Sequence, residues 1–257
     1  MKAIIVAAGP GSRLMPLTAE KPKCLLEIGG QTMLERTLSV LRNTGIDKIV
    51  VVRGYHSEMI NFPGITYYQN SDFKNNNILK SLFYAEDEMD EDFVFSYSDI
   101  IYSKEIVQKL ITSRADVGLI TDVNWVQRYQ GRDQHPISEA ELVKVANGRI
   151  VKIGKEEVSP GEAHGEFIGL AKFTREGARA MRAAYHRVKQ IQPPAPFHHA
   201  ASLDKAYLTD MLQELIEIGS VIENIDVEGG WIEIDTPQDL TEAVSLLSGA
   251  QSSASAL

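Results

Sequence analysis

Runs of apolar residues alternate with amphipathic segments along the chain. Residues 2–8, 48–53 and 92–97 are apolar at most positions, as in strands that are buried on both faces of a parallel sheet. Between these runs, residues 33–43 and 78–88 repeat apolar side chains at the spacing of an α-helix. Strands that alternate with helices predict an α/β fold with a doubly wound, mostly parallel sheet of the Rossmann-like type.

The rest of the chain continues this alternation and adds one irregular stretch. Further strands are expected at residues 65–69, 117–122, 166–173, 221–227 and 231–234, and further helices at residues 103–113, 174–190, 205–218 and from 236 onward. Residues 140–145 and 149–154 flank Asn147-Gly148, which predicts a β-hairpin. Together with the polar and aromatic residues 125–136, this hairpin predicts a small β-rich lid at about residues 123–165.

Composition narrows the class of protein. One domain accounts for residues 1–248, and the tail at 249–257 is expected to be disordered. The net charge of −9 disfavours nucleic-acid binding, which needs a basic surface. No run approaches the roughly 18 apolar residues of a membrane span, no signal peptide is evident, and Cys24 alone excludes an internal disulfide. We therefore expect a cytoplasmic protein with small-molecule partners; the sequence leaves a homodimer open.

The loop after the first strand carries the clearest chemical signal. The apolar run ends in Gly9-Pro10-Gly11, so backbone N–H groups are exposed at the carboxyl end of the sheet, and Arg13 and Lys23 add two positive charges. These groups suit a nucleoside triphosphate. The residues expected to line its site here are Ala7, Ala8, Gly9, Gly11 and Ser12. An ordinary βα turn with surface cations is the alternative.

Two common phosphate-binding motifs do not fit this loop. Leu14 stands where a dinucleotide fingerprint needs its third glycine, and Gly11-Ser12-Arg13 lacks the Gly-Lys-Ser/Thr of a P-loop. The stretch instead resembles the signature of the nucleotidyltransferases that activate sugar phosphates, phosphocholine and phosphonates, which reads G-x-G-x-R-L, then P-L-T, then P-K. The matching residues are Gly9, Gly11, Arg13, Leu14, Pro16, Leu17, Thr18, Pro22 and Lys23.

This resemblance extends from Met1 to about Leu247 and is weakest at residues 123–163. It implies the fold of the nucleotide-diphospho-sugar transferases, with Arg13 and Lys23 as catalytic residues. In such a reaction a phosphate or phosphonate oxygen of the acceptor attacks the α-phosphorus, and pyrophosphate leaves. That oxygen is already ionised near neutral pH, so no general base is needed, and no nucleophile motif is present.

Two aspartates are the candidate metal ligands. Asp99 follows the strand at residues 92–97, and its alternative role is a turn at the strand end. Asp235 precedes Thr236, Pro237 and Asp239, which form a complete helix start and leave Asp235 without a capping role. Mg²⁺ usually takes one or two protein carboxylates together with substrate phosphates. The resembling family places Mg²⁺-binding aspartates at both points, which implies Mg²⁺ as cofactor here.

An asparagine cluster marks the expected base site. Residues 75–77 are all asparagine, where the sugar-type members carry a glycine-rich segment. This departure resembles the phosphocholine and aminoalkylphosphonate cytidylyltransferase branch, which implies CTP as co-substrate. Asn76, Asn77 and Ser81 would then read a pyrimidine edge. The alternative for Asn77 is that it only caps the helix that follows.

The acceptor site is expected in the irregular middle of the chain. Its candidate residues are Asp122, Trp125, Tyr129, Arg132, Glu139, Lys155 and Glu166. An aromatic side chain beside carboxylates suits an ammonium group, and Arg132 or Lys155 would hold a phosphate or phosphonate. The alternative is a lid held together by its own salt bridges. His135 is interpreted as a loop or surface histidine.

The sequence therefore predicts a Mg²⁺-dependent cytidylyltransferase that acts on a small monoester of the 2-aminoethylphosphonate or phosphocholine type. A sugar-1-phosphate nucleotidyltransferase is the alternative enzyme. An inactive, nucleotide-sensing regulatory homologue is the alternative of another class.

Overall fold

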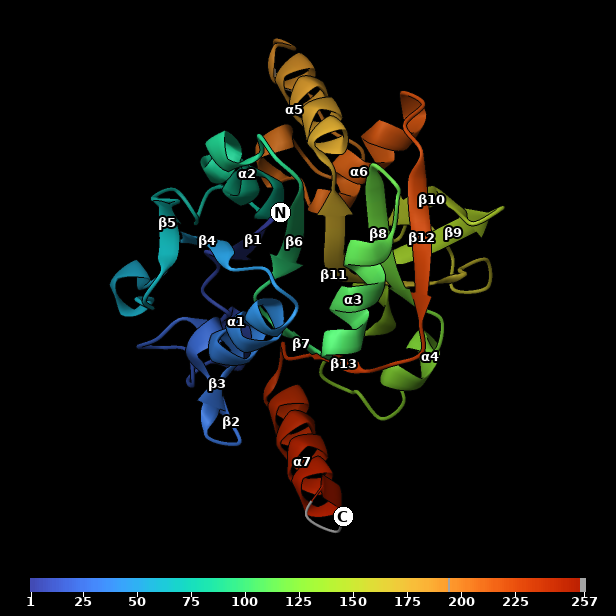
Figure 1. Ribbon diagram of the computed structural model, residues 1–257. Helices are drawn as coiled ribbons and strands as arrows, with labels where there is room; N and C mark the ends of the chain where they lie inside the picture. The colour runs from blue at the N-terminus through green and yellow to red at the C-terminus, as the bar shows by residue number, and fades with distance from the viewer. Residues whose placement is uncertain (194, 255–257) are drawn as a thin grey trace.

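A nine-stranded sheet forms the centre of the computed structural model, which describes residues 1–193 and 195–254, with only the backbone over 248–254 (Figure 1). Seven of these strands run in one direction, and β10 and β11 run opposite to them. The strand order is β5 (Ile65–Gln69), β4 (Lys48–Arg53), β1 (Lys2–Ala7), β6 (Phe93–Tyr97), β11 (Gly165–Phe173), β8 (Val117–Asp122), β12 (Ile222–Val227), β10 (Arg149–Gly154) and β9 (Leu142–Ala146).

Helices cover both faces of the sheet, so the predicted doubly wound α/β fold is confirmed. Alternate residues of β1 belong to different apolar clusters: Ile4 and Val6 face one side, and Ala3 and Ile5 face the other. The first side is covered by α2 (Ile78–Leu82), α5 (Arg175–Lys189) and α6 (Leu208–Glu217), and the second by α1 (Met33–Asn43) and α3 (Lys104–Thr112).

The predicted hairpin is formed by β9 and β10, and it joins the edge of the main sheet. Asn147 and Gly148 have φ angles of 52° and 72°, which are the positive values that a tight two-residue turn needs. Strand β9 also pairs with β11 through Gly165 and Glu166. Five strands thus close into a ring at this end of the sheet, and the ring forms one wall of the site described below.

Two short strands that lie apart from the main sheet join distant parts of the chain. Strand β7 (Ile100–Tyr102) pairs antiparallel with β13 (Trp231–Glu233). The sequence predicted β13 but gave no signal for β7, which has only three residues. A further hairpin, β2 (Glu27–Ile28) with β3 (Gln31–Thr32), was also not predicted.

Three helix boundaries differ from the sequence expectation. The helix expected over 78–88 is α2 followed by a 3₁₀ helix, Phe83–Glu88, because Ala85 leaves the helical region at φ −102°. A 3₁₀ turn, Leu203–Lys205, precedes α6. Helix α7 (Pro237–Ala254) continues past residue 249, where a disordered tail was expected. Residues 255–257 lie outside the described residues.

Among the described helices, none combines the length and apolar character that crossing a bilayer requires.

Gly169 provides a test of the sheet packing. It has a φ of +84° at the register shift between β11 and β8, and a Cβ atom there would lie 2.2 Å from Cδ2 of Tyr97. We expect Gly169→Ala to lower the free energy of unfolding by about 1–3 kcal/mol, because it adds both backbone strain and a clash. Urea unfolding measures this change. Gly161→Ala is the matched control, since a Cβ there meets nothing within 4 Å; equal stabilities of the two variants would contradict the prediction.

Candidate active site

The loop after β1 is built around Gly11. Its φ is +62°, and a Cβ atom at this position would lie 2.8 Å from Cβ of Lys23. The hydroxyl of Thr18 donates a hydrogen bond of 2.9 Å to the carbonyl oxygen of Gly11. Only glycine satisfies both the backbone angle and the close approach. The loop backbone therefore packs directly on Lys23.

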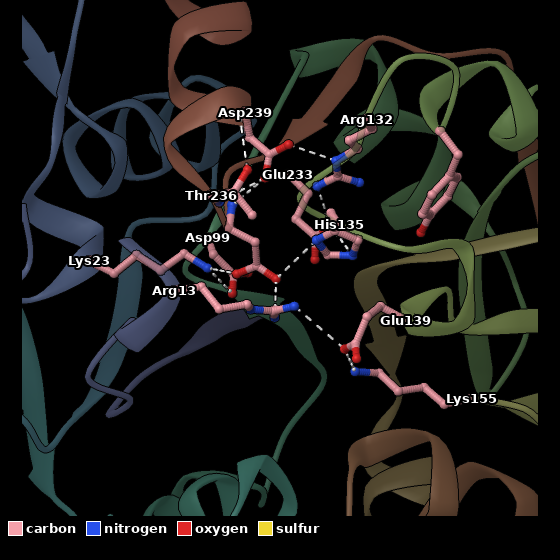
Figure 2. A network of polar contacts seen from close by, with 12 residues as sticks. Arg13, Lys23, Asp99, Arg132, His135, Glu139, Lys155, Glu233, Thr236 and Asp239 are labelled. Atoms are coloured by element: carbon pink, nitrogen blue, oxygen red, sulfur yellow. Dashed lines mark hydrogen bonds and ion pairs between the residues drawn. The ribbon is translucent and has the colours of Figure 1, made fainter. Parts of the chain in front are cut away.

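Pairing of β7 with β13 brings Asp99 beside Asp235, although 136 positions of sequence separate them. The backbone N–H of Ile234 donates to the carbonyl oxygen of Asp99 at 2.9 Å. Nζ of Lys23 lies 3.0 Å from Oδ2 of Asp99 and also donates to Oδ1 of Asp235. Arg13 donates to Oδ2 of Asp235, and Figure 2 shows the side chains of Arg13, Lys23 and Asp99 pointing toward one another. The two carboxylates thus converge opposite the amino-terminal loop, as the sequence predicted.

These charges shift one another's pKa values. Burial alone would raise the pKa of Asp235, but Lys23 and Arg13 outweigh burial and hold that pKa well below its ordinary value. Burial would lower the pKa of Lys23, but Asp99 and Asp235 raise it overall. Lys23 is therefore a permanent cation in a buried position, and Asp235 is a permanent anion.

The start of α7 leaves the carboxylate of Asp235 free for this role. The backbone N–H groups of Asp235 and Thr236 donate to Oδ2 of Asp239, at 2.9 and 2.8 Å. In return, the backbone N–H of Asp239 donates to the hydroxyl of Thr236 at 3.3 Å. The helix start predicted from Thr236 and Asp239 is thereby confirmed.

A cleft of about 400 Å³ lies over the carboxyl end of β1 and contains this charge cluster. Most of the site residues proposed from the sequence line it. They are Ala7, Ala8, Gly9, Gly11, Ser12, Arg13, Lys23, Asn76, Asn77, Ser81, Asp99, Glu139, Lys155, Glu166 and Asp235.

On the side of α2, Asn77 has a structural task. Its Oδ1 accepts from the N–H of Ile78 at 2.9 Å, which caps the helix, and its Nδ2 donates to the carbonyl oxygen of Lys205 at 3.1 Å. The alternative of a helix cap therefore describes the Asn77 side chain. Asn76 is also bonded to protein partners, whereas the Ser81 hydroxyl accepts one hydrogen bond and has no acceptor for its own proton among the described residues.

On the opposite side, Glu139, Lys155 and Glu166 face the cleft. Nζ of Lys155 lies 3.0 Å from Oε2 of Glu139, and the same oxygen lies 3.6 Å from Nη1 of Arg13. Burial raises the pKa of Glu166 to about 7, although a hydrogen bond from the Tyr129 hydroxyl opposes the shift. Its Oε2 is buried and has no hydrogen-bond partner among the described residues.

Four residues expected to contact the acceptor lie outside the lining of the cleft among the described residues: Asp122, Trp125, Tyr129 and Arg132. Asp122 is fully buried and instead accepts from the indole N–H of Trp231 at 2.7 Å. Trp125 packs in a small apolar cluster behind the cleft. The expectation of direct contact is corrected for these residues, because neighbouring side chains already occupy their functional groups.

Tyr129 and Arg132 lie behind the cleft and hold in place residues that line it or lie next to it. The hydroxyl of Tyr129 donates to Oε1 of Glu166 at 2.6 Å. Arg132 donates to Asp239 at 2.7 Å and to Glu233 at 3.0 Å, so its guanidinium is not available for a phosphate. This correction leaves Lys155 as the cation on the acceptor side.

Sequence reasoning missed Glu233 and His135, which both line the cleft. Glu233 is the last residue of β13 and lies two positions before Asp235 in the sequence. Burial and then Asp235 raise the pKa of Glu233. His135 was taken for a loop or surface residue, but it is 2% exposed, with Nδ1 3.6 Å from Oδ2 of Asp235. Burial lowers its pKa to about 4, so the ring is neutral at pH 7.

Comparison with known proteins identifies relatives of this chain. Residues 3–150 match the family model of the MobA-like NTP transferase domain. The chain is 32% identical over 251 residues to CTP:phosphoglutamine cytidylyltransferase of Campylobacter jejuni, covering 93% of this chain and 98% of the relative. It is 27% identical to the UTP–glucose-1-phosphate uridylyltransferase AglF of Haloferax volcanii, with 95% of each chain covered.

Further similarity exists to 2-aminoethylphosphonate cytidylyltransferase of Lancefieldella rimae, at 26% identity over 90% of this chain and 93% of the relative. The structure of CTP:phosphocholine cytidylyltransferase from Streptococcus pneumoniae superimposes with a TM-score of 0.74 at 19% identity, covering 96% of this chain and 98% of that one. This structural likeness shows a common fold, which is that of the nucleotidyltransferases. The chain therefore belongs to the family of MobA-like NTP transferases, and it is a nucleotidyltransferase.

Proposed function

We propose that the protein is a Mg²⁺-dependent cytidylyltransferase. It would condense CTP with a small phosphate or phosphonate monoester, releasing pyrophosphate and a CMP-linked product. The observation that carries this proposal is the convergence of Asp99 and Asp235 on Nζ of Lys23, beneath the loop of Gly11 and Arg13. The C. jejuni and L. rimae relatives, both named as cytidylyltransferases, support CTP as the nucleotide.

The residues present fit a magnesium ion. Oδ1 of Asp99 is buried and has no hydrogen-bond partner among the described residues, although it lies beside a cleft lined by cations. Carboxylate oxygens are the hard ligands that Mg²⁺ prefers, with phosphate oxygens and water completing the coordination. Asp99 and Asp235 would hold the ion, which would neutralise charge on the phosphates. His135 and Glu233 lie near Asp235 as well: the His135 nitrogen is a poorer ligand for Mg²⁺, whereas Glu233 offers a further carboxylate oxygen.

The rest of the chemistry needs only positioning. An ionised acceptor oxygen forms a bond to the α-phosphorus, and the bond from the α-phosphorus to the bridging oxygen of pyrophosphate breaks. Lys23 and Arg13 stabilise the charge on the phosphate oxygens. The side chain of Arg13 is 44% exposed, so it can turn from Asp235 and Glu139 toward a bound triphosphate.

On the acceptor side, we assign two roles. Lys155 would bind the phosphate or phosphonate in place of Glu139, its present partner. Glu166 would accept a hydrogen bond from a donor group on the acceptor through its unpaired Oε2. The acceptor would therefore carry an amine, amide or hydroxyl group.

One assay tests the proposal as a whole. Pyrophosphate release is measured with each of four nucleoside triphosphates against phosphocholine, 2-aminoethylphosphonate, phosphoethanolamine, a phosphorylated glutamine and glucose 1-phosphate. We expect turnover with CTP and an acceptor that carries a hydrogen-bond donor, lost with EDTA and restored by Mg²⁺. The H. volcanii relative makes a sugar-1-phosphate enzyme the second candidate; turnover with glucose 1-phosphate alone would establish that candidate instead.

Removing either carboxylate charge should stop the reaction. We expect Asp99→Asn and Asp235→Asn to lower kcat by roughly a hundred- to a thousandfold, since each variant removes a negative ligand while Lys23 stays buried. Circular dichroism checks that each variant is folded. The control is Asp47→Asn, at an exposed position away from the cleft. Wild-type kcat in a folded Asp99 or Asp235 variant would remove that residue from the site.

The raised pKa of Glu166 predicts how Glu166→Gln changes stability with pH. The folded protein keeps a proton on Glu166 up to a pKa of about 7, whereas the unfolded chain releases it near 4.5. Wild-type stability therefore falls relative to the glutamine variant as pH rises from 4.5 to 7, and the difference is constant above that window. Urea unfolding across this range measures it.

Glu242→Gln, on the exposed face of α7, is the control for this experiment and should show no such trend. A difference between wild type and Glu166→Gln that does not vary with pH would refute the assignment. The same variant should also reduce kcat/KM for the acceptor more than kcat/KM for CTP.

A further inference from the structure

Asn70 is a completely buried polar residue that lies directly after β5, behind the wall of the cleft formed by α2. It does not line the cleft and carries no role in the site as described so far. Its side-chain amide contacts Asp72, Asn76 and Ser81. Since Asn76 and Ser81 do line the cleft, Asn70 connects the interior of the protein to the proposed base site.

Two backbone groups fix which way the amides in this network point. The backbone N–H of Asp72 lies 3.0 Å from Oδ1 of Asn70, and an N–H group can only meet an acceptor. The backbone carbonyl of Asp72 lies 2.8 Å from Nδ2 of Asn76, and a carbonyl can only meet a donor. Neither amide can be turned over without losing a bond to the main chain.

The remaining contacts follow from these orientations. Nδ2 of Asn70 donates one proton to Oδ1 of Asn76 at 2.7 Å and the other to Oγ of Ser81 at 2.9 Å. The hydroxyl of Ser81 therefore already accepts a hydrogen bond, and its own proton must point elsewhere. Among the described residues no acceptor takes that proton, and Ser81 lines the cleft.

The two neighbouring asparagines differ in what they leave for a ligand. Both groups of the Asn76 amide are bonded to Asn70 and Asp72. The amide of Asn77 is bonded to Ile78 and Lys205. Of the three residues expected to read the base, Asn76 keeps no amide proton for a ligand, whereas Ser81 keeps its hydroxyl proton and Asn77 keeps the second proton of Nδ2 among the described residues.

We propose that Asn70 is a positioning residue for base selection, which makes the Ser81 hydroxyl a donor toward N3 of cytosine. This inference rests on the proposed function, in which CTP occupies the cleft. N3 of cytosine carries a lone pair and accepts a hydrogen bond, whereas N3 of uracil carries a hydrogen. Asn70 occupies one of the two lone pairs of the Ser81 oxygen, so uracil N3–H could meet only the remaining lone pair and would leave the Ser81 proton without an acceptor among the described residues, whereas cytosine N3 accepts that proton.

A cycle of one substitution and one nucleotide analogue measures this contact. The analogue is 3-deazacytidine triphosphate, in which a C–H group replaces N3. We expect wild type to lose about tenfold in kcat/KM on going from CTP to the analogue, the amount that one hydrogen bond provides. Ser81→Ala should use the two nucleotides equally well. An equal preference for CTP over the analogue in both proteins would overturn the proposal.

A second substitution tests Asn70 itself. Asn70→Asp replaces the donor Nδ2 by a carboxylate oxygen, which would accept the Ser81 proton and leave a lone pair facing the base. The ratio of kcat/KM for CTP to that for UTP should then fall by about tenfold or more. The matched control is Asn43→Asp on α1, where an exposed asparagine amide also contacts a serine hydroxyl, that of Ser39, at 3.4 Å. It should leave the ratio unchanged.

The outcomes separate this inference from the proposed function. If the wild-type protein transfers no cytidylyl group to any acceptor, the proposed function and this inference are both refuted. Turnover of CTP with an unchanged CTP-to-UTP ratio in folded Asn70→Asp would remove only the inference. If Asn70→Asp does not fold, the Ser81→Ala cycle decides, because an alanine there cannot distinguish N3 from a C–H group.

Discussion

The buried ammonium group of Lys23 is the interaction on which the site depends. It is held between Asp99 and Asp235, which come from different parts of the chain. A charge in this position is tolerated only with partners, so the three groups stabilise one another. Lys23 also packs against Gly11, and the triphosphate loop and the carboxylate pair are therefore fixed in one geometry.

Charge balance extends from this centre through the wall of the cleft. Arg13 neutralises Asp235 from the loop side, and Arg132 binds Glu233 and Asp239 from behind. Ligands would change these pairings: phosphates compete for Arg13 and for Lys155, which both now contact Glu139. Charged side chains that line the cleft can therefore exchange a protein partner for a ligand phosphate. The charged groups behind the cleft keep their protein partners and hold the wall in place.

In the middle of the chain, several side chains that could bind a ligand instead support the residues around the cleft. Asp122, Trp125, Tyr129 and Arg132 have the chemistry of a ligand site, but buried neighbours use it. Their work is to hold Glu166, Trp231 and the start of α7 in place. Asn70 does the same on the opposite wall, where two backbone groups of Asp72 set the direction of a chain of hydrogen bonds that ends at Ser81.

The sequence by itself determined the α/β alternation, the Gly11 loop with Arg13 and Lys23, and the freedom of Asp235 from capping, because each depends on residues close together in the chain. Tertiary structure alone decided the rest. The pairing of β7 with β13, the burial of His135, and the choice between contact and support among the polar residues of 122–139 all depend on partners far away in sequence. Residue type states what a side chain can bind, but only folding decides whether a neighbour has already bound it.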